Sequence, residues 1–347
     1  MKKTLVFAMI ALAALMTSCK GGSNVSLSGA GATFPAPFYN DATKQFGEVQ
    51  GIRVSYGGTG SGAGIRNLQD MTVDFGGTDV FLSDTEITEM PAEVIHIPTC
   101  IGGIVMAYNL EGVSELKLTP DLVTKIYLGE ITNWNDPQLA EVNEGVTLPD
   151  QAITVVYRSE GSGTTAVFTG FMSKVNEGWK AGIGEGKSVN FPIGIAAKGN
   201  PGVAGVINET KGSIGYIGSE YSLALQIPAA KMLNKAGNYI EANMESISLS
   251  GNIANMPDDT RMIISDSDNA DAYPISTFTW LLVYKEQSYN GRSIEQAQAL
   301  QNFLLYLIGD EGAESAKKTH FAPLPEVARA KAEAAIKSMT FEGTPLQ

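Results

Sequence analysis

Three segments of the chain repeat one local design: a strand pattern, a turn rich in glycine and hydroxyl residues, and then a helix pattern. They are GAGATFPAPFY (29–39), GGTGSGAG (57–64) and RSEGSGTT (158–165). The first residues of a helix leave backbone N–H groups unpaired at the positive end of the helix dipole. Glycine lets an anion approach these groups closely. One such turn is commonly only a helix cap, but three of them, one carrying Arg158, predict a site for a small anion.

Strand and helix patterns alternate along the whole chain, which predicts an α/β fold. Residues 100–110 and 276–286 are two long apolar strand patterns that lie far apart in the sequence but are alike in character. A helix is expected to start near Ser61, the apolar residues between 167 and 175 have helical spacing, and two amphipathic helices are expected at the C-terminus. The length of 347 residues suits two domains.

The overall charge does not favour an anion site, because 37 acidic residues face 24 basic ones and the formal net charge is -13. A buried oxyanion can nevertheless be neutralised by fixed N–H and O–H dipoles. Each hydrogen bond to a charged group contributes about 1.5–3 kcal/mol. Arg158 then adds one planar guanidinium group, which is permanently charged and can donate two parallel hydrogen bonds. So acidic a chain is a poor candidate for binding nucleic acid or an anionic membrane surface.

The N-terminus predicts export. Two lysines precede an apolar run, 5–16, that is too short to span a membrane and ends in the small residues before Cys19. A cysteine in this place is typical of a bacterial lipobox, although Met16 stands where leucine is usual. We therefore expect residues 1–18 to be a signal peptide, Cys19 to carry the lipid, and residues 19–23 to form a flexible tether. The alternative is an ordinary signal peptide with a chance cysteine. The other cysteine, Cys100, is expected to be buried and unpaired.

Two glycine-rich or acidic motifs resemble sites that the sequence does not support. AGIGEGKS (181–188) fits a relaxed phosphate-loop pattern, but no strand precedes it and Pro192 prevents a helix from following, so no nucleotide site is expected. DSDNAD (266–271) resembles the start of a calcium loop. It lacks the glycine of the sixth position, where Asp271 stands, and the glutamate of the twelfth, where Thr277 stands. We expect a solvated loop there and no metal.

Catalysis is not expected either. Ser162 stands between two glycines, but a nucleophile elbow needs glycine two residues to each side, where this chain has Glu160 and Thr164. The chain has only two histidines, His96 and His320, from which a hydrolytic site would have to be built. The sequence therefore predicts a binding protein without a cofactor and not an enzyme.

Four motifs together resemble the PstS family, the substrate-binding proteins of high-affinity phosphate ABC transporters. These motifs are GAGATFPAPFY, VDFGGTD, EGSGTT and GKSVNFP. The resemblance spans nearly the whole mature chain, including IPTCIGGIVMAYNL and YLGEITNWND. It implies a two-lobed periplasmic-binding-protein fold of type II, in which the chain crosses between lobes twice, near Cys100 and Ala272, and the ligand lies in the cleft. Lobe 1 would comprise 24–100 and 272–347, and lobe 2 would comprise 101–271.

The resemblance also implies a function. The protein would bind inorganic phosphate as a monomer, lipid-anchored to a bacterial cell membrane, and deliver it to permease subunits that work with a cytoplasmic ATPase. A binder of another tetrahedral oxyanion, such as sulfate, is the close alternative, and a secreted phosphomonoesterase is the more distant one. The family's phosphate contacts fall on Thr33, Phe34 (through its backbone N–H), Ser61, Asp79, Arg158, Ser162, Gly163 and Thr164.

Two acidic residues of this site need an explanation. Asp79 repels a dianion, unless the ligand brings a proton for which the ionised carboxylate is an acceptor. Phosphate carries such a proton near neutral pH and sulfate does not, so Asp79 predicts selection of phosphate. The alternative is that Asp79 only caps a loop or pairs with an arginine. Glu160 stands where the family commonly has an aspartate paired to the arginine, and the longer side chain could shift that pairing.

Overall fold

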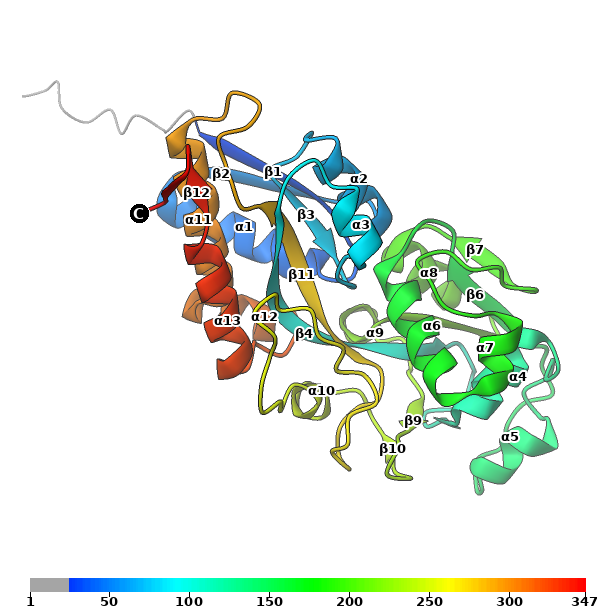
Figure 1. Cartoon of the computed structure of the whole chain (residues 1–347). Coiled ribbons are helices and arrows are strands. Elements are labelled where there is room, and N and C mark those ends of the chain that lie inside the picture. The colour runs from blue at the N-terminus through cyan, green and yellow to red at the C-terminus, as the bar shows by residue number, and fades with distance from the viewer. Residues whose placement is uncertain (1–24) are drawn as a thin grey trace, which may run out of the picture.

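The computed structural model describes residues 25–347, so the predicted signal peptide, Cys19 and the tether lie outside the described residues. One eight-stranded sheet runs through the molecule in the order β2-β1-β3-β11-β4-β8-β6-β7. Figure 1 shows the two lobes that this sheet connects, with helices on both faces of each half. The α/β class and the two-lobed architecture predicted from the sequence are confirmed.

The first lobe surrounds the half-sheet β2-β1-β3-β11-β4. Its first three strands run parallel, and β11 is antiparallel to both β3 and β4. The strands are β1 (Ser26–Gly31), β2 (Arg53–Gly58), β3 (Phe75–Thr78), β4 (Val94–Tyr108) and β11 (Ser276–Tyr284). The helices are α1 (Ala36–Gln50), α2 (Ser61–Gln69), α3 (Asp84–Thr88), α11 (Ile294–Ile308), α12 (Asp310–Lys318) and α13 (Glu326–Lys337). A short ribbon of β12 (Thr340–Phe341) and β13 (Thr344–Pro345) follows.

The second lobe surrounds the far end of β4 and the strands β8, β6 and β7, with a small separate sheet β10-β9-β5 beside them. Its strands are β5 (Lys117–Leu118), β6 (Thr154–Arg158), β7 (Ile195–Ala197), β8 (Ser213–Gly218), β9 (Lys231–Leu233) and β10 (Tyr239–Ile240). Its helices are α4 (Pro120–Leu128), α5 (Pro137–Val142), α6 (Gly163–Val175), α7 (Glu177–Gly182), α8 (Gly199–Glu209) and α9 (Ser219–Leu225).

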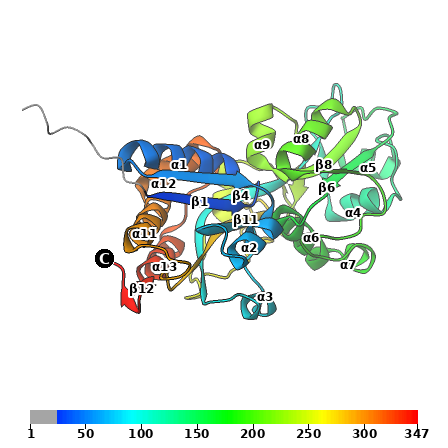
Figure 2. The same cartoon turned by 90° about the horizontal axis from the view of Figure 1, so that it is seen from above.

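Strand β4 joins the two lobes. It pairs with β11 up to Gly103 and with β8 from Ile104 onward, so the change of partner takes place between two adjacent residues. The returning chain passes through α10 (Met244–Ser250), which packs on β4 beside Gly103 through the side chain of Ile247. Figure 2, from above, shows β4 and β11 between the two groups of helices.

The long apolar strand patterns of the sequence correspond to β4 and β11, which are buried along almost their whole length. Both faces are covered by helices or loops, which explains why these strands are continuously apolar rather than alternating. Cys100 lies in β4 as a buried free thiol, as expected. Within residues 25–347, no helix combines the length and the apolar character that crossing a membrane would need.

Candidate functional site

The three strand–turn–helix units predicted from the sequence are β1–α1, β2–α2 and β6–α6. Strand β1 is parallel to both β2 and β3, so the carboxyl ends of these three strands meet at one edge of the sheet. The turn between β6 and α6 approaches this edge from the other lobe. There the N–H of Gly62, in α2, donates to the carbonyl of Gly161 at 3.0 Å, and Figure 2 shows α2 beside α6.

The first lobe brings Thr33, Phe34, Ser61 and Asp79 to this edge, and all four are buried. The Asp79 N–H donates to Ser61 Oγ at 3.4 Å, and Asp79 Oδ1 accepts from Thr279 Oγ1 at 3.1 Å. The ring of Phe34 is fully buried in the core. Its N–H donates to no group of residues 25–347, so this amide is available to a ligand.

The second lobe brings Arg158, Ser162, Gly163 and Thr164. The guanidinium of Arg158 donates from Nη1 to Thr164 Oγ1 at 3.1 Å, and from Nε and Nη2 to Glu160 Oε1. The longer acid therefore still pairs with the arginine. Ser162 caps α6, whose first two residues are Gly163 and Thr164. Their N–H groups lie where a helix offers no intrahelical acceptor.

The two sets of residues touch across the cleft. Thr164 Oγ1 lies 3.4 Å from Asp79 Oδ2, to which it donates. A β-carbon added at Gly163 would lie 2.7 Å from Asp79 Oδ2 and would collide with the Ser61 hydroxyl. Glycine is therefore required at position 163 for the lobes to approach this closely. The structure thus gathers all eight predicted residues in one place.

The carboxyl group of Asp79 is the unusual member of this cluster. Burial raises its pKa to about 7, although the Arg158 charge and the hydroxyls of Thr279 and Thr164 act in the opposite direction. Around it, the N–H and O–H groups of the cluster are donors. Such an arrangement can bind an anion that offers several acceptor oxygens and one O–H, since an ionised carboxylate accepts the hydrogen of that O–H.

Two residues of the cluster were not predicted. Asn200 Nδ2 donates to Thr33 Oγ1 at 3.0 Å and to Thr164 Oγ1 at 3.1 Å, and the Tyr221 hydroxyl donates to the Thr33 carbonyl at 2.6 Å. A signal for Asn200 was present, because strand β7 is followed by Lys198 and then by helix α8, which starts with Gly199 and Asn200 and so resembles the other strand–turn–helix units. Strand β7 is only three residues long and largely exposed, which made the pattern weak.

The residues of the phosphate-loop-like and hydrolase-like motifs have other partners in the structure. Residues 183–194 contain no helix, and Lys187 forms an ion pair with Glu86 of the first lobe instead of serving a phosphate loop. His96 Nε2 accepts from the Leu82 N–H at 3.1 Å, and neither histidine hydrogen-bonds to Ser162. No group of three or more His, Cys, Asp or Glu side chains in residues 25–347 could hold a metal ion.

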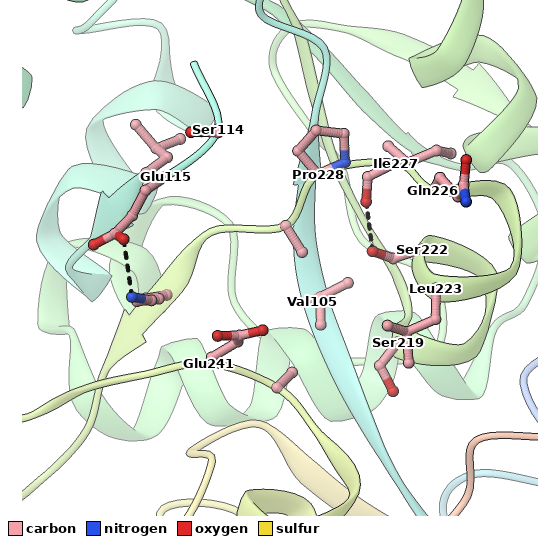
Figure 3. A pocket seen from close by; sticks show the side chains of 14 residues that line it. Val105, Ser114, Glu115, Ser219, Ser222, Leu223, Gln226, Ile227, Pro228 and Glu241 are labelled. Atoms are coloured by element: carbon pink, nitrogen blue, oxygen red, sulfur yellow. Dashed lines mark hydrogen bonds and ion pairs between the residues drawn. The ribbon is translucent and has the colours of Figure 1, made fainter. Parts of the chain in front are cut away.

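A hollow of 480 Å³ lies in the second lobe beside β4 (Figure 3) but contains none of the eight residues. It is lined by Val105, by α9 and by the segments around β5, β9 and β10. Its polar groups are partly paired: Lys231 Nζ lies 3.1 Å from Glu115 Oε2, and Ser222 Oγ donates to the Ile227 carbonyl at 2.7 Å. The candidate site is the buried cluster between the lobes and not this open hollow.

Comparison with known proteins places the chain among binding proteins. A family model described as a PBP superfamily domain matches residues 18–311. The phosphate-binding protein PstS of Xylella fastidiosa is 34% identical over 312 residues, which cover 89% of this chain and 84% of that protein. PstS of Pasteurella multocida is 34% identical over 319 residues and 90% of each chain.

Two solved structures are similar in fold. A high-affinity periplasmic phosphate-binding protein bound with phosphate matches with a TM-score of 0.71 at 21% identity, over 89% of this chain and 93% of that one. The phosphate-binding protein of Stenotrophomonas maltophilia matches with a TM-score of 0.68 at 20% identity and the same coverage of both chains. At about 20% identity the similarity shows only that this chain has the same two-lobed fold as these proteins.

Proposed function

Because the chain belongs to the PBP superfamily and, within it, to the family of PstS phosphate-binding proteins, we propose that it binds inorganic phosphate outside the cytoplasm and delivers it to the permease of a phosphate ABC transporter. The observation that carries this proposal is the position of one buried carboxylate, Asp79, within a ring of donors that includes Arg158. Phosphate near neutral pH matches this ring, because it has several acceptor oxygens and at least one O–H.

The proposed contacts are shared between the lobes. The amide of Phe34 and the hydroxyls of Thr33 and Ser61 bind phosphate oxygens from the first lobe, and Asp79 accepts the phosphate proton. From the second lobe, the Arg158 guanidinium and the start of α6 supply the remaining donors. At the start of α6, the hydroxyl of the cap residue and the backbone N–H groups of the first turn act together. These second-lobe contacts are Arg158, Ser162, Gly163 and Thr164.

Calorimetric titration against a panel of oxyanions tests this proposal. We expect tight binding of phosphate, competition by arsenate, which keeps its proton, and weak binding of sulfate. A preference for sulfate would favour the alternative oxyanion binder. A phosphomonoesterase would instead turn over a phosphate ester, and turnover that disappears in Ser162→Ala would replace the binding proposal with an enzymatic one.

Binding is proposed to close the cleft. The lobes 24–100 with 272–347 and 101–271 would move as units, and phosphate would favour the closed arrangement because it contacts both. Small-angle scattering should give a smaller radius of gyration with phosphate than without it. Arg158→Met, which weakens the ligand contact, serves as the control, and its radius should stay unchanged at the same phosphate concentration.

The protein is further proposed to be exported and anchored by lipid at Cys19, with the domain held on the tether of residues 19–23. The MTSC motif before the tether supports this. Metabolic labelling with palmitate should mark the protein, and Cys19→Ala should abolish both the label and the attachment to membranes. A parent protein that never acquires the label contradicts lipidation without affecting the proposal of phosphate binding.

A further inference from the structure

Asn200 lies in the first turn of α8 and is completely buried. Its Oδ1 accepts from the Gly218 N–H at 2.9 Å, at the end of strand β8. This bond fixes which end of the amide is the oxygen, so Nδ2 must face the opposite way. There its two hydrogens point to one hydroxyl of each lobe, Thr33 Oγ1 and Thr164 Oγ1, at 3.0 and 3.1 Å.

The hydroxyl of Thr33 has no freedom left as an acceptor. Its oxygen accepts from Asn200 twice, from the backbone N–H at 3.1 Å and from Nδ2 at 3.0 Å. A hydroxyl oxygen has two lone pairs and one hydrogen, so both lone pairs are occupied. The hydrogen of the Thr33 hydroxyl donates to no group of residues 25–347, and it is therefore available only to a ligand.

The hydroxyl of Thr164 is in the same position. Its oxygen accepts from Arg158 Nη1 and from Asn200 Nδ2, each at 3.1 Å. Its hydrogen is directed toward the site, where its contact within the protein is the long one of 3.4 Å to Asp79 Oδ2. Both threonines are thus donors. The Asn200 amide occupies one lone pair of each hydroxyl, and the second lone pair is occupied by the Asn200 backbone N–H at Thr33 and by Arg158 Nη1 at Thr164.

We propose that Asn200 is a positioning residue that turns the hydroxyl hydrogens of Thr33 and Thr164 toward the bound anion, and that it does so for Thr33 only when the lobes are together. The inference rests on the proposed function in so far as the anion is phosphate. It extends that function, because Asn200 belongs to the second lobe and Thr33 to the first. Closure of the cleft would itself change Thr33 from a hydroxyl free to rotate into an obligatory donor.

A double-mutant cycle tests this. Asn200→Asp keeps the size of the side chain and the acceptor for the Gly218 N–H, but at alkaline pH, where the carboxyl is ionised, it replaces Nδ2 with an oxygen that cannot donate. The hydroxyl of Thr33 should then turn to this oxygen and away from the anion. Thr33→Val should lower phosphate affinity about 10- to 150-fold in the parent, but about 3-fold or less in the Asn200→Asp background.

Ser162→Ala is the matched control, because the Ser162 hydroxyl does not contact Asn200. Its loss of affinity should be the same in the parent and in Asn200→Asp. The added negative charge of the aspartate lowers affinity equally in the two members that carry Asn200→Asp, so it cancels when the effect of Thr33→Val is compared within that background. Equal losses for Thr33→Val in both backgrounds would overturn the proposal and leave Asn200 with a packing role.

A second measurement needs no variant and can overturn the proposal even if Asn200→Asp does not fold. In the phosphate-bound parent, the hydroxyl proton of Thr33 should show a scalar coupling through the hydrogen bond to the ³¹P nucleus, as should that of Thr164. Two ordered hydroxyl protons without such coupling would overturn the proposal. If the parent binds another oxyanion in place of phosphate, the proposed function fails, and the same cycle run with that anion still decides the role of Asn200.

Discussion

The two sides of the cleft differ in charge although they contact the same site. The side of the second lobe carries Arg158, whose guanidinium is held by Glu160 and Thr164. Among residues 25–347, the buried charged group that the first lobe brings to the site is the carboxyl of Asp79. The difference teaches that the site is not complementary to a bare anion. It suits the proposed ligand, an anion that has a proton on one side and unprotonated oxygens on the other.

The charges of the site do not by themselves attract a dianion. With Asp79 ionised, two carboxylates stand beside one guanidinium, since Glu160 shares Arg158. The N–H and O–H dipoles at the helix starts must therefore contribute most of the favourable interaction. This agrees with the acidic composition of the whole chain, from which few cations were expected near the ligand.

The largest effect is expected from the substitution that removes the carboxylate acceptor of the first lobe. Asp79→Asn can turn an N–H donor toward an unprotonated oxygen, so sulfate should bind better and phosphate worse. Sites built to bond a ligand's O–H reject analogues that lack it by as much as about 10⁴–10⁵. The phosphate-to-sulfate affinity ratio, measured by calorimetry, should fall by several powers of ten. A ratio equal to that of the parent would mean that Asp79 only caps its loop or pairs with Arg158.

The next largest effect is expected from the substitution that removes the cation of the second lobe. Arg158→Met leaves Glu160 without its partner in a partly buried place, and loss of one partner of a buried pair costs about 3–5 kcal/mol. Phosphate and sulfate affinities should fall together, because both anions need the guanidinium. Lys174→Met, which removes a cation paired with Asp266 elsewhere in the same lobe, should leave both affinities unchanged. If Arg158→Met changed the phosphate-to-sulfate affinity ratio instead of lowering both affinities alike, Arg158 would contribute to selectivity, which contradicts the role given to it here.

The pH dependence of stability reports on the same carboxyl group without ligand. The folded-state pKa of Asp79 is about 7, against an ordinary value of 3.8. Between these values the folded protein keeps a proton that the unfolded chain has lost. The free energy of unfolding should therefore fall as pH rises from about 4 to about 7, by at most about 4 kcal/mol.

Denaturant unfolding of the phosphate-free protein at pH 5 and pH 7.5 checks this dependence. In Asp79→Asn the free energy of unfolding should fall less between the two pH values than in the parent. At pH 7.5 the variant should therefore be more stable than the parent. The decrease that remains has a second source in Glu220, whose pKa burial also raises. Glu220→Gln should remove that remainder. If Asp79→Asn keeps the full decrease, Asp79 is ionised in the folded protein throughout this range.

A smaller effect separates binding from folding at the start of α6. Ser162→Ala should weaken phosphate binding by about 1.5–3 kcal/mol through one hydrogen bond to a charged group. It should also lower stability by about 1 kcal/mol, because Ser162 Oγ accepts from the Thr165 N–H as a helix cap. Ser293→Ala removes the corresponding cap of α11. That variant should show the loss of stability without the loss of binding.

The smallest expected effect concerns the ion pair between the lobes. Lys187→Met removes its bond to Glu86, which is partly exposed, and such pairs contribute about 0–1 kcal/mol. Phosphate affinity should fall by less than tenfold, and the difference from the parent should diminish at high salt. Lys331→Met, which breaks a pair with Asp258 outside the cleft, should have no effect on binding. A loss above tenfold would show that this pair, more than the ligand contacts, holds the lobes together.

Much of the fold could be predicted because its signals are local. Apolar runs predicted β4 and β11, and glycine-rich turns predicted the start of α2 near Ser61 and a helix, α6, after the turn of residues 158–165. The roles of Asn200 and Lys187 could not be predicted in this way. Asn200 lies 167 residues from Thr33, and Lys187 lies 101 residues from Glu86. Their contacts exist only once the two lobes are placed, and no periodicity of the chain encodes that placement.

The single-residue change of partner in β4 has a consequence for how the cleft can move. Gly103 pairs with β11 and Ile104 pairs with β8, so no free linker separates the lobes at this crossing. Any opening must then be absorbed as elastic twist along a hydrogen-bonded strand. We therefore expect the strand to resist twisting and to favour one relative orientation of the lobes, unlike a flexible loop. Amide hydrogen exchange in β4 should therefore stay slow on both sides of this point, even while the turns around the anion site exchange quickly.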